Sequence, residues 1–334
     1  MPAAASAALA PAHVSIRTMI TARAPGHNPG LEWWLRPVPA LAAAHVALAA
    51  VLWARPGLLA VYLWYLGPPI LALLAIALLA GALVESFRRR AAWDRRRAAG
   101  LAGLALVVGL VPFYRTYPSS HDGRPSGVRF RLPLDGPVTV AWGGPTRDVN
   151  YHAGMPDQRW AYDLLVTSGG RSTRGAGTEV DDYLAFDRPV RAPASGVVRA
   201  AHDGEPDEAP GAHRARRAFG NYVILEVAPG EFLFIAHLRR GSVRVGPGDR
   251  VEAGQAIARV GSSGNSSEPH VHVHLQDTPR PYFGEAIPFE FSGYRRQDGT
   301  LVDRGMPRGG VVGGRYVGEI VEHAAGGLRA GRTR

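Results

Sequence analysis

The sequence predicts two unlike parts, an N-terminal helical membrane segment and a C-terminal domain that is mostly antiparallel β structure. Three apolar runs fill most of residues 37–114. After residue 127 the pattern changes to short runs rich in valine, isoleucine and aromatic residues, separated by glycine and proline. No long amphipathic helical pattern interrupts these later runs, so we expect them to pair as antiparallel strands.

Composition excludes several kinds of chemistry. The chain has 334 residues, a formal net charge of +10 and 46% hydrophobic residues, which is too apolar for a disordered protein and long enough for two domains. Cysteine is absent, which excludes a disulfide framework, a lipoprotein anchor, a thiolate zinc site and a cysteine nucleophile. Lysine is absent too, so Schiff-base chemistry and a P-loop lysine are excluded.

The apolar runs predict three transmembrane helices within residues 37–114, preceded by a flexible cytoplasmic tail at 1–36. Residues 58–84 carry no charge and exceed the ~20 residues that cross a hydrocarbon core of about 30 Å. Residues 37–53 are apolar apart from His45, and residues 98–114 are near the lower limit of about 17 residues. For these two runs, a buried soluble helix or an interfacial segment is the alternative.

An arginine-rich loop predicts the orientation of the helices. Residues 88–97 contain six arginines and join the second apolar run to the third. Short loops of this kind stay on the cytoplasmic side. One more crossing puts everything after residue 114 outside the cytoplasm, so we expect a multi-pass protein with an extracytoplasmic C-terminal domain. The first residues lack the early positive charge of a cleaved signal peptide.

We expect the β domain to cover residues 128–293, after a linker at 115–127 that is rich in proline, serine and glycine. The predicted strands are 128–132, 138–142, 160–166, 196–201, 222–227, 232–237, 256–260 and 270–275. We expect a loop at 203–217 and a basic, glycine-rich tail at 294–334.

Three histidines alternate with valine in the last predicted strand, His270-Val271-His272-Val273-His274. A strand sends alternate side chains to one face, so the three imidazoles line one surface about 7 Å apart, at roughly 3.3 Å per residue. Adjacent imidazoles are costly to bury unless a metal or hydrogen bonds offset the cost. Since imidazole is a common metal ligand, this strand predicts a metal site.

Three further residues are candidates to complete that site. Without cysteine, the three or four ligands of a zinc ion must be histidine, aspartate or glutamate. Asp163 interrupts an otherwise apolar strand, where an unpaired carboxylate is costly. His152 precedes it in a loop, and His237 ends the apolar run 232–236. Taken singly, each histidine is also consistent with a surface or hydrogen-bonded residue, His237 less so than His152.

An ordered set of motifs resembles the lysostaphin-type zinc endopeptidases of bacterial cell walls. The resemblance covers residues 138–291. Its motifs are the turn and strand at 189–198, the Phe219-Gly220-Asn221 strand start, the segment 234–238, the glycine-rich stretches 245–255 and 261–266, and the His270-x-His272 pair. Each motif alone is weak, and their order is specific. The resemblance implies a duplicated hybrid motif, a β-sandwich-like fold.

The resemblance also implies roles for the candidate residues. His152, Asp163 and His272 resemble the zinc ligands, whereas His237 and His270 resemble the two histidines that handle protons and stabilise the transition state. His152 departs from the pattern, because it lies eleven positions before Asp163 and common members place that histidine only four positions before it. Residues 158–163 resemble a divergent branch with a longer loop. His274 stands where many relatives have glutamate and receives no role.

Taken together, the resemblance implies a membrane-anchored zinc metalloendopeptidase of the bacterial cytoplasmic membrane that hydrolyses amide bonds in peptidoglycan stems or cross-bridges. Its expected partners are peptidoglycan, the membrane and a regulatory protein, with no nucleic acid. One alternative is an inactive relative that binds the wall or activates another hydrolase, although such proteins typically lack several of the five residues. A second alternative, a biotinyl-lipoyl-type carrier suggested by residues 193–198 and 248–254, lacks the lysine that a carrier needs.

Overall fold

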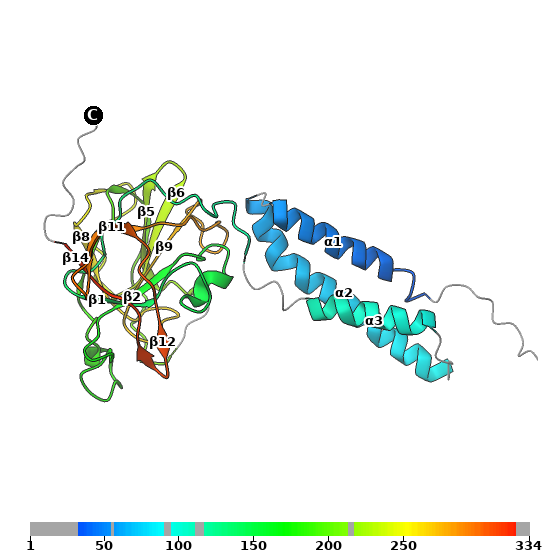
Figure 1. Cartoon of the computed structure of the whole chain (residues 1–334). Coiled ribbons are helices and arrows are strands. Elements are labelled where there is room, and N and C mark those ends of the chain that lie inside the picture. The colour runs from blue at the N-terminus through cyan, green and yellow to red at the C-terminus, as the bar shows by residue number, and fades with distance from the viewer. Residues whose placement is uncertain (1–32, 55–56, 90–94, 111–116, 213–216, 325–334) are drawn as a thin grey trace, which may run out of the picture.

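The structure is a computed structural model in which a helical bundle adjoins a β domain (Figure 1). It describes residues 33–54, 57–89, 95–110, 117–212 and 217–324. The expected cytoplasmic tail up to residue 32, the centre of the arginine-rich loop at 90–94 and the chain end at 325–334 lie outside the described residues.

The three predicted helices form at the three apolar runs. They are α1 (Val38–Ala54), α2 (Leu58–Arg89) and α3 (Arg95–Leu110), and α1 and α3 both pack against α2 (Figure 1). Small residues allow the helices and the residues just before α1 to approach one another closely, as is typical of helices packed in membranes. A Cβ atom on Gly100 would lie 2.9 Å from the Trp34 ring, and one on Gly81 would lie 2.6 Å from the Trp33 ring.

Among the described helices, only α2 is long and apolar enough to cross a membrane. Its segment Leu58–Arg88 has a mean hydropathy of 2.4, and only 11% of its apolar window is buried inside the molecule. Helix α1 is apolar but has 17 residues, and α3 has 16 and begins with three arginines. These lengths support one candidate span near the N-terminus and do not support the expected multi-pass topology.

The β domain is built on one ten-stranded sheet with the strand order β11-β10-β14-β1-β2-β9-β6-β5-β4-β7, and every strand pair in it is antiparallel. Strands β3 with β8, and β12 with β13, form two small antiparallel sheets. This confirms the predicted fold class. The strands are β1 (Val138–Trp142), β2 (Tyr162–Leu165), β3 (Pro189–Arg191), β4 (Gly196–His202), β5 (Asn221–Ala228), β6 (Glu231–Leu238), β7 (Arg250–Val251), β8 (Ala256–Arg259), β9 (Val271–Gln276), β10 (Phe291–Arg296), β11 (Leu301–Gly305), β12 (Val311–Val312), β13 (Arg315–Tyr316) and β14 (Ile320–His323).

Alternation along the strands separates the core from the polar face. Val271, Val273 and Leu275 of β9 belong to the main hydrophobic core, whereas His272 and His274 do not, because successive side chains of a strand point to opposite faces. The same alternation places Val223 and Leu225, then Leu233 and Ile235, in that core. The largest side chains that complete it are Tyr162, Phe130, Phe289, Phe291 and Tyr294.

The prediction of a tail at 294–334 is wrong for residues 294–324, the part that the structure describes. Strands β10, β11 and β14 extend the sheet, and β14 pairs with β1, with Val138 opposite Val321. The segment Ile320–His323 follows Gly318, is only four residues long and has two polar residues, so composition alone predicts a loop there. The predicted strand 128–132 is reduced to a single bridge between Phe130 and Phe291.

The expected linker is packed against the β domain. The Ser126 backbone N–H donates to the carbonyl oxygen of Pro288 at 2.8 Å, and Arg159 Nη1 donates to that of Tyr117 at 2.9 Å. The start of α2 reaches the same region, since the rings of Tyr62 and Phe283 lie 5.8 Å apart. Residues 117–126 therefore hold the β domain beside the first turns of α2, rather than leaving it on a free tether.

Candidate metal centre

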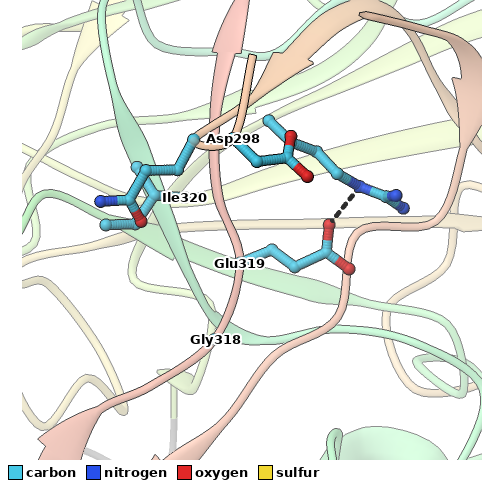
Figure 2. A pocket seen from close by; sticks show the side chains of 6 residues that line it. Asp298, Gly318, Glu319 and Ile320 are labelled. Carbon is cyan, nitrogen blue, oxygen red and sulfur yellow. Dashed lines mark hydrogen bonds and ion pairs between the residues drawn. The ribbon is translucent and has the colours of Figure 1, made fainter. Parts of the chain in front are cut away.

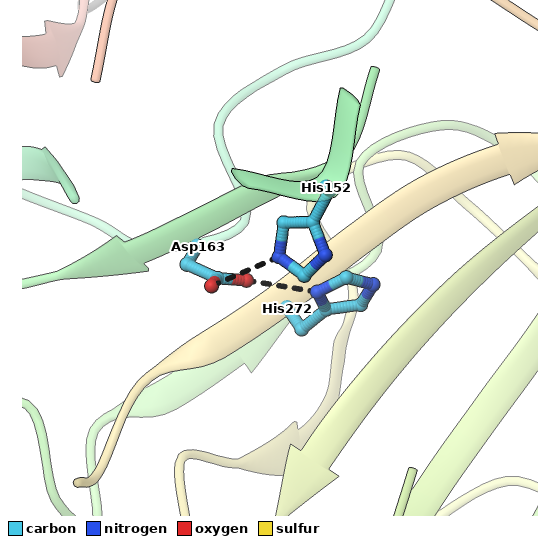
Figure 3. Close-up of side chains that lie close together, drawn as sticks. All are labelled: His152, Asp163 and His272. Carbon is cyan, nitrogen blue, oxygen red and sulfur yellow. Dashed lines mark hydrogen bonds and ion pairs between the residues drawn. The ribbon is translucent and has the colours of Figure 1, made fainter. Parts of the chain in front are cut away.

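The pairing of β2 with β9 brings the predicted aspartate to the predicted histidine. Asp163 lies directly opposite His272 in the antiparallel register. Asp163 Oδ1 lies 2.8 Å from His272 Nδ1, as Figure 3 shows. Two residues that are 109 positions apart in the chain thus become cross-strand neighbours at the centre of the sheet.

A short 3-10 turn, Tyr151–Gly154, delivers His152 to the same carboxylate. His152 Nε2 lies 3.1 Å from Asp163 Oδ2 (Figure 3). The buried Asn150 fixes the turn: its side-chain oxygen accepts from the His152 N–H, and its Nδ2 donates to the carbonyl oxygens of Gly144 and Ala161 at 2.9 and 3.1 Å. This capped loop explains how a histidine eleven residues before the aspartate reaches it.

The three side chains fit a zinc ion as a donor set. One donor atom from each of His152, Asp163 and His272 lies within 4.8 Å of the other two, and all three residues are buried. Ligand atoms around tetrahedral zinc, with bonds of about 2.0–2.2 Å, lie roughly 3.5 Å apart. Two imidazoles and one carboxylate leave a fourth position open, which is the arrangement of catalytic zinc sites.

The protonation states suit metal binding. Burial would raise the pKa of Asp163, but the imidazoles of His152, His270 and His272 hold it well below its usual range. Burial lowers the pKa of His272 to about 4, against the opposing effect of Asp163. At neutral pH the carboxylate is charged and the His272 imidazole is neutral, and these are the forms that bind metals.

The two other predicted histidines lie beside this donor set. His237, at the end of β6, and His270, just before β9, have ring centroids 4.7 Å apart. His237 Nδ1–H donates to the Ser263 carbonyl oxygen at 2.9 Å, and His270 Nδ1–H donates to that of Glu268 at 2.8 Å. In the neutral form of either ring, the lone pair is therefore on Nε2. His270 Nε2 lies 3.6 Å from Asp163 Oδ1.

Burial and neighbouring imidazoles keep His237 neutral. Desolvation lowers the pKa of His237 well below its usual value, and the nearby His270 and His272 rings lower it further. The backbone of His237 has a φ of 60°, a left-handed conformation that is uncommon outside glycine. Such a conformation is held only where the surrounding structure determines it, as at functional sites.

A hollow of about 220 Å³ opens next to the donor set, and aromatic side chains from distant segments line it. Trp142 ends β1, Tyr151 belongs to the 3-10 turn and Tyr316 belongs to β13. Sequence reasoning missed all three. Only Tyr151 could have been singled out from the sequence, because it directly precedes His152. In the structure, burial and the adjacent Asp163 raise the pKa of Tyr151. Tyr316 lies in the segment that composition marks as a tail.

Two other features lie apart from this centre. A hollow of about 500 Å³ beside the β10–β11 turn is lined by no site histidine, and its Glu319 carboxylate pairs with Arg296 at 2.8 Å (Figure 2). His121, Asp277 and Glu285 also cluster, but both carboxylates already accept hydrogen bonds: Glu285 from Ser120, and Asp277 from the Glu285 backbone. They tie residues 119–121 to the 277–286 loop.

A model of one protein family matches the chain. Peptidase family M23 matches residues 180–282. This chain carries an M23 peptidase domain. The matched residues contain His237, His270 and His272, whereas His152 and Asp163 precede them in the β1–β2 region of the same sheet. A comparison with curated proteins finds no match.

Solved structures similar to the chain include M23 peptidases. One is the catalytic domain, in mutant form, of the prophage-encoded M23 protein EnpA from Enterococcus faecalis, with 21% identity, 48% of this chain and 94% of that chain covered, and a TM-score of 0.32. The catalytic domain of lysostaphin from Staphylococcus simulans has 18% identity, 45% and 86% coverage and a TM-score of 0.27. A zinc-containing peptidase from Vibrio cholerae has 20% identity, 44% and 36% coverage and a TM-score of 0.29. At these values the likeness carries no conclusion about activity.

Proposed function

We propose that this protein is a membrane-anchored zinc metalloendopeptidase that hydrolyses amide bonds in the peptide stems or cross-bridges of peptidoglycan. One observation carries the proposal: His152, Asp163 and His272 form a buried three-donor set, with His237 and His270 beside it, in a chain with an M23 peptidase domain. The inactive-relative alternative is less favoured, because all five residues are present and close together.

His152, Asp163 and His272 would hold the zinc ion, which when bound lowers the pKa of a water molecule and polarises the scissile carbonyl. The Nε2 lone pairs of His237 and His270 suit them to accept a proton, because their Nδ1–H groups are committed to backbone carbonyls. A ring that has accepted a proton then donates at Nε2, either to the developing oxyanion or to the leaving amine.

The proposed substrate follows from the family resemblance and from the chemistry of the hollow. A peptide laid beside the donor set would contact Trp142, Tyr151 and Tyr316, whose rings present apolar surface with polar tips. Two carboxylates line this hollow, and both are already engaged: Asp163 contacts His152 and His272, and Glu268 accepts a hydrogen bond from Ser172 Oγ. Neither is therefore free to act as the acid or nucleophile of a glycosidase. The proposed cut is therefore in peptide and not in sugar chains.

Digestion of purified peptidoglycan by the full-length protein in detergent tests this proposal. With zinc, we expect new amino groups to appear without new reducing sugar ends, and a chelator is expected to abolish their release. Muropeptide analysis by mass spectrometry then identifies the cut bond. If the protein binds peptidoglycan firmly but releases no new amino groups from several bridge types, the enzymatic proposal is wrong. The protein would then be a wall-binding regulator of another hydrolase.

The orientation of the membrane anchor also belongs to this proposal, with α2 as the candidate span and the β domain outside the cytoplasm. Helices α1 and α3 both pack against α2, whose first turns lie beside the β domain (Figure 1). Exposed aromatic residues at that end, Trp53, Tyr62 and Tyr65, suit a membrane–water interface, and exposed arginines flank the other end. A reporter fused after residue 118 is expected to be active only outside the cytoplasm. Activity of that fusion only as a cytoplasmic reporter would contradict both the topology and the wall substrate.

A further inference from the structure

One buried histidine of the cluster has no role in the mechanism above. His274 is on the same face of β9 as His272, and it is completely buried. Its ring stacks on Phe234, with centroids 4.5 Å apart and planes at 18°, and it also lies 5.5 Å from the Phe219 ring. These aromatic neighbours fix the plane of the imidazole. An imidazole in such surroundings is costly unless both its nitrogens have a use.

The Nδ1 nitrogen of His274 contacts the proposed metal ligand His272. It lies 2.8 Å from Nε2 of His272, and the other His272 nitrogen, Nδ1, faces Asp163. One of the two facing nitrogens must therefore carry a hydrogen and the other a lone pair. Which arrangement forms decides whether His272 has a lone pair on Nδ1 for a metal.

Gln276, the next residue on the same face of β9, favours one of the two arrangements. Its Nε2 donates to the carbonyl oxygens of Thr278 and Arg280 at 2.6 and 2.9 Å, so its side chain presents an oxygen at the other position. Gln276 Oε1 and His274 Nε2 are both buried, and neither has a partner within hydrogen-bond distance among the described residues. Burial lowers the pKa of His274, and the neighbouring Gln276 side chain acts in the opposite direction, as an acceptor would. Because an amide oxygen only accepts, this neighbour favours the form of His274 with its hydrogen on Nε2.

The remaining positions follow one from another. With the hydrogen on Nε2, neutral His274 has its lone pair on Nδ1 and accepts from His272 Nε2–H. His272 then has its lone pair on Nδ1, facing the Asp163 carboxylate at 2.8 Å. Two acceptors face each other there, an arrangement that a cation relieves.

We infer that His274 is a positioning residue, which together with Gln276 fixes His272 in the Nε2–H tautomer and so directs the Nδ1 lone pair toward the metal. This inference rests on the proposed zinc site and adds a residue to it. Partners of this kind behind a ligating histidine typically contribute 10–100-fold in metal affinity.

Matched substitutions separate the hydrogen bond from packing. His274→Gln keeps an acceptor on a side chain of similar reach, and His274→Leu fills the space without one. Zinc affinity is measured on the full-length protein in detergent by competition with a chromophoric chelator. We expect His274→Leu to bind zinc about 10–100-fold more weakly than the wild type, and His274→Gln to stay within a few-fold of it. Gln276→Met, which leaves His274 in place, is expected to weaken binding as well.

A second measurement needs neither zinc nor activity. In the metal-free protein labelled with 15N-histidine, NMR is expected to show His272 with its hydrogen on Nε2, and to show it on Nδ1, facing Asp163, in His274→Leu. If His274→Leu keeps both the wild-type zinc affinity and the Nε2–H tautomer, His274 only packs and the inference is wrong. If the wild type itself binds no zinc, the proposed function fails, whereas the tautomer measurement still judges this inference.

Discussion

Asp163→Asn is expected to remove the zinc and to lower peptide hydrolysis by at least roughly 1,000-fold. Both carboxylate oxygens of Asp163 are engaged, one 3.1 Å from His152 and the other 2.8 Å from His272. Asparagine keeps the size of the side chain but removes its negative charge and one oxygen acceptor, so it cannot balance a divalent cation in a buried site. Metal analysis of the purified protein and the release of amino groups measure the two effects.

Asp303→Asn is the matched control for this change. Asp303 is an exposed carboxylate, paired with Arg129 on the outer part of the sheet, and its side chain is 82% exposed. Its replacement is expected to leave zinc content and hydrolysis unchanged, since exposed ion pairs contribute little. An Asp163→Asn protein that retained one zinc per chain would show that the ligand set is placed elsewhere.

His237→Ala is expected to keep the zinc and to lose roughly 100- to 10,000-fold in turnover. His237 lies outside the donor set, and its Nδ1–H is committed to the Ser263 carbonyl oxygen, so its Nε2 is free for proton transfer. His270→Ala is expected to behave in the same way. Zinc content and kcat are measured on the same preparation, with His323→Ala on strand β14 as the histidine control.

The result that would contradict this assignment is a coupled loss. If His237→Ala lost zinc in proportion to activity, His237 would be a ligand, and the proposed division between metal-holding and proton-handling histidines would be wrong. Zinc retained with undiminished turnover would instead assign His237 a structural role at the end of β6.

Alternation made β9 predictable in detail. Because a strand has a period of two residues, the residue pattern from 270 to 275 by itself predicts both a core face and a histidine face. Asp163 could be singled out because a carboxylate in an apolar strand needs a partner. That the partner is His272 depends on the β2–β9 register, which is a tertiary pairing over 109 residues that no local pattern specifies.

Other features could not be predicted from the sequence for the same reason, because they depend on tertiary pairing. The C-terminal strands are two to six residues long, and β14 is stabilised by pairing with β1 and β10, so local composition reads the segment as a tail. Tyr316 could not be placed at the hollow without that pairing. His274 was visible as a third histidine, but its use depends on the position of Gln276 and on two loop carbonyls.

Titration of zinc into the metal-free full-length protein, with the release of amino groups from peptidoglycan followed at each addition, tests the central claim most directly. The account predicts that hydrolysis is absent without metal, rises linearly and saturates at one zinc per chain, and that Asp163→Asn shows no rise over the same range. Hydrolysis that persists in the metal-free protein, or one bound zinc per chain without any release of amino groups, would contradict it.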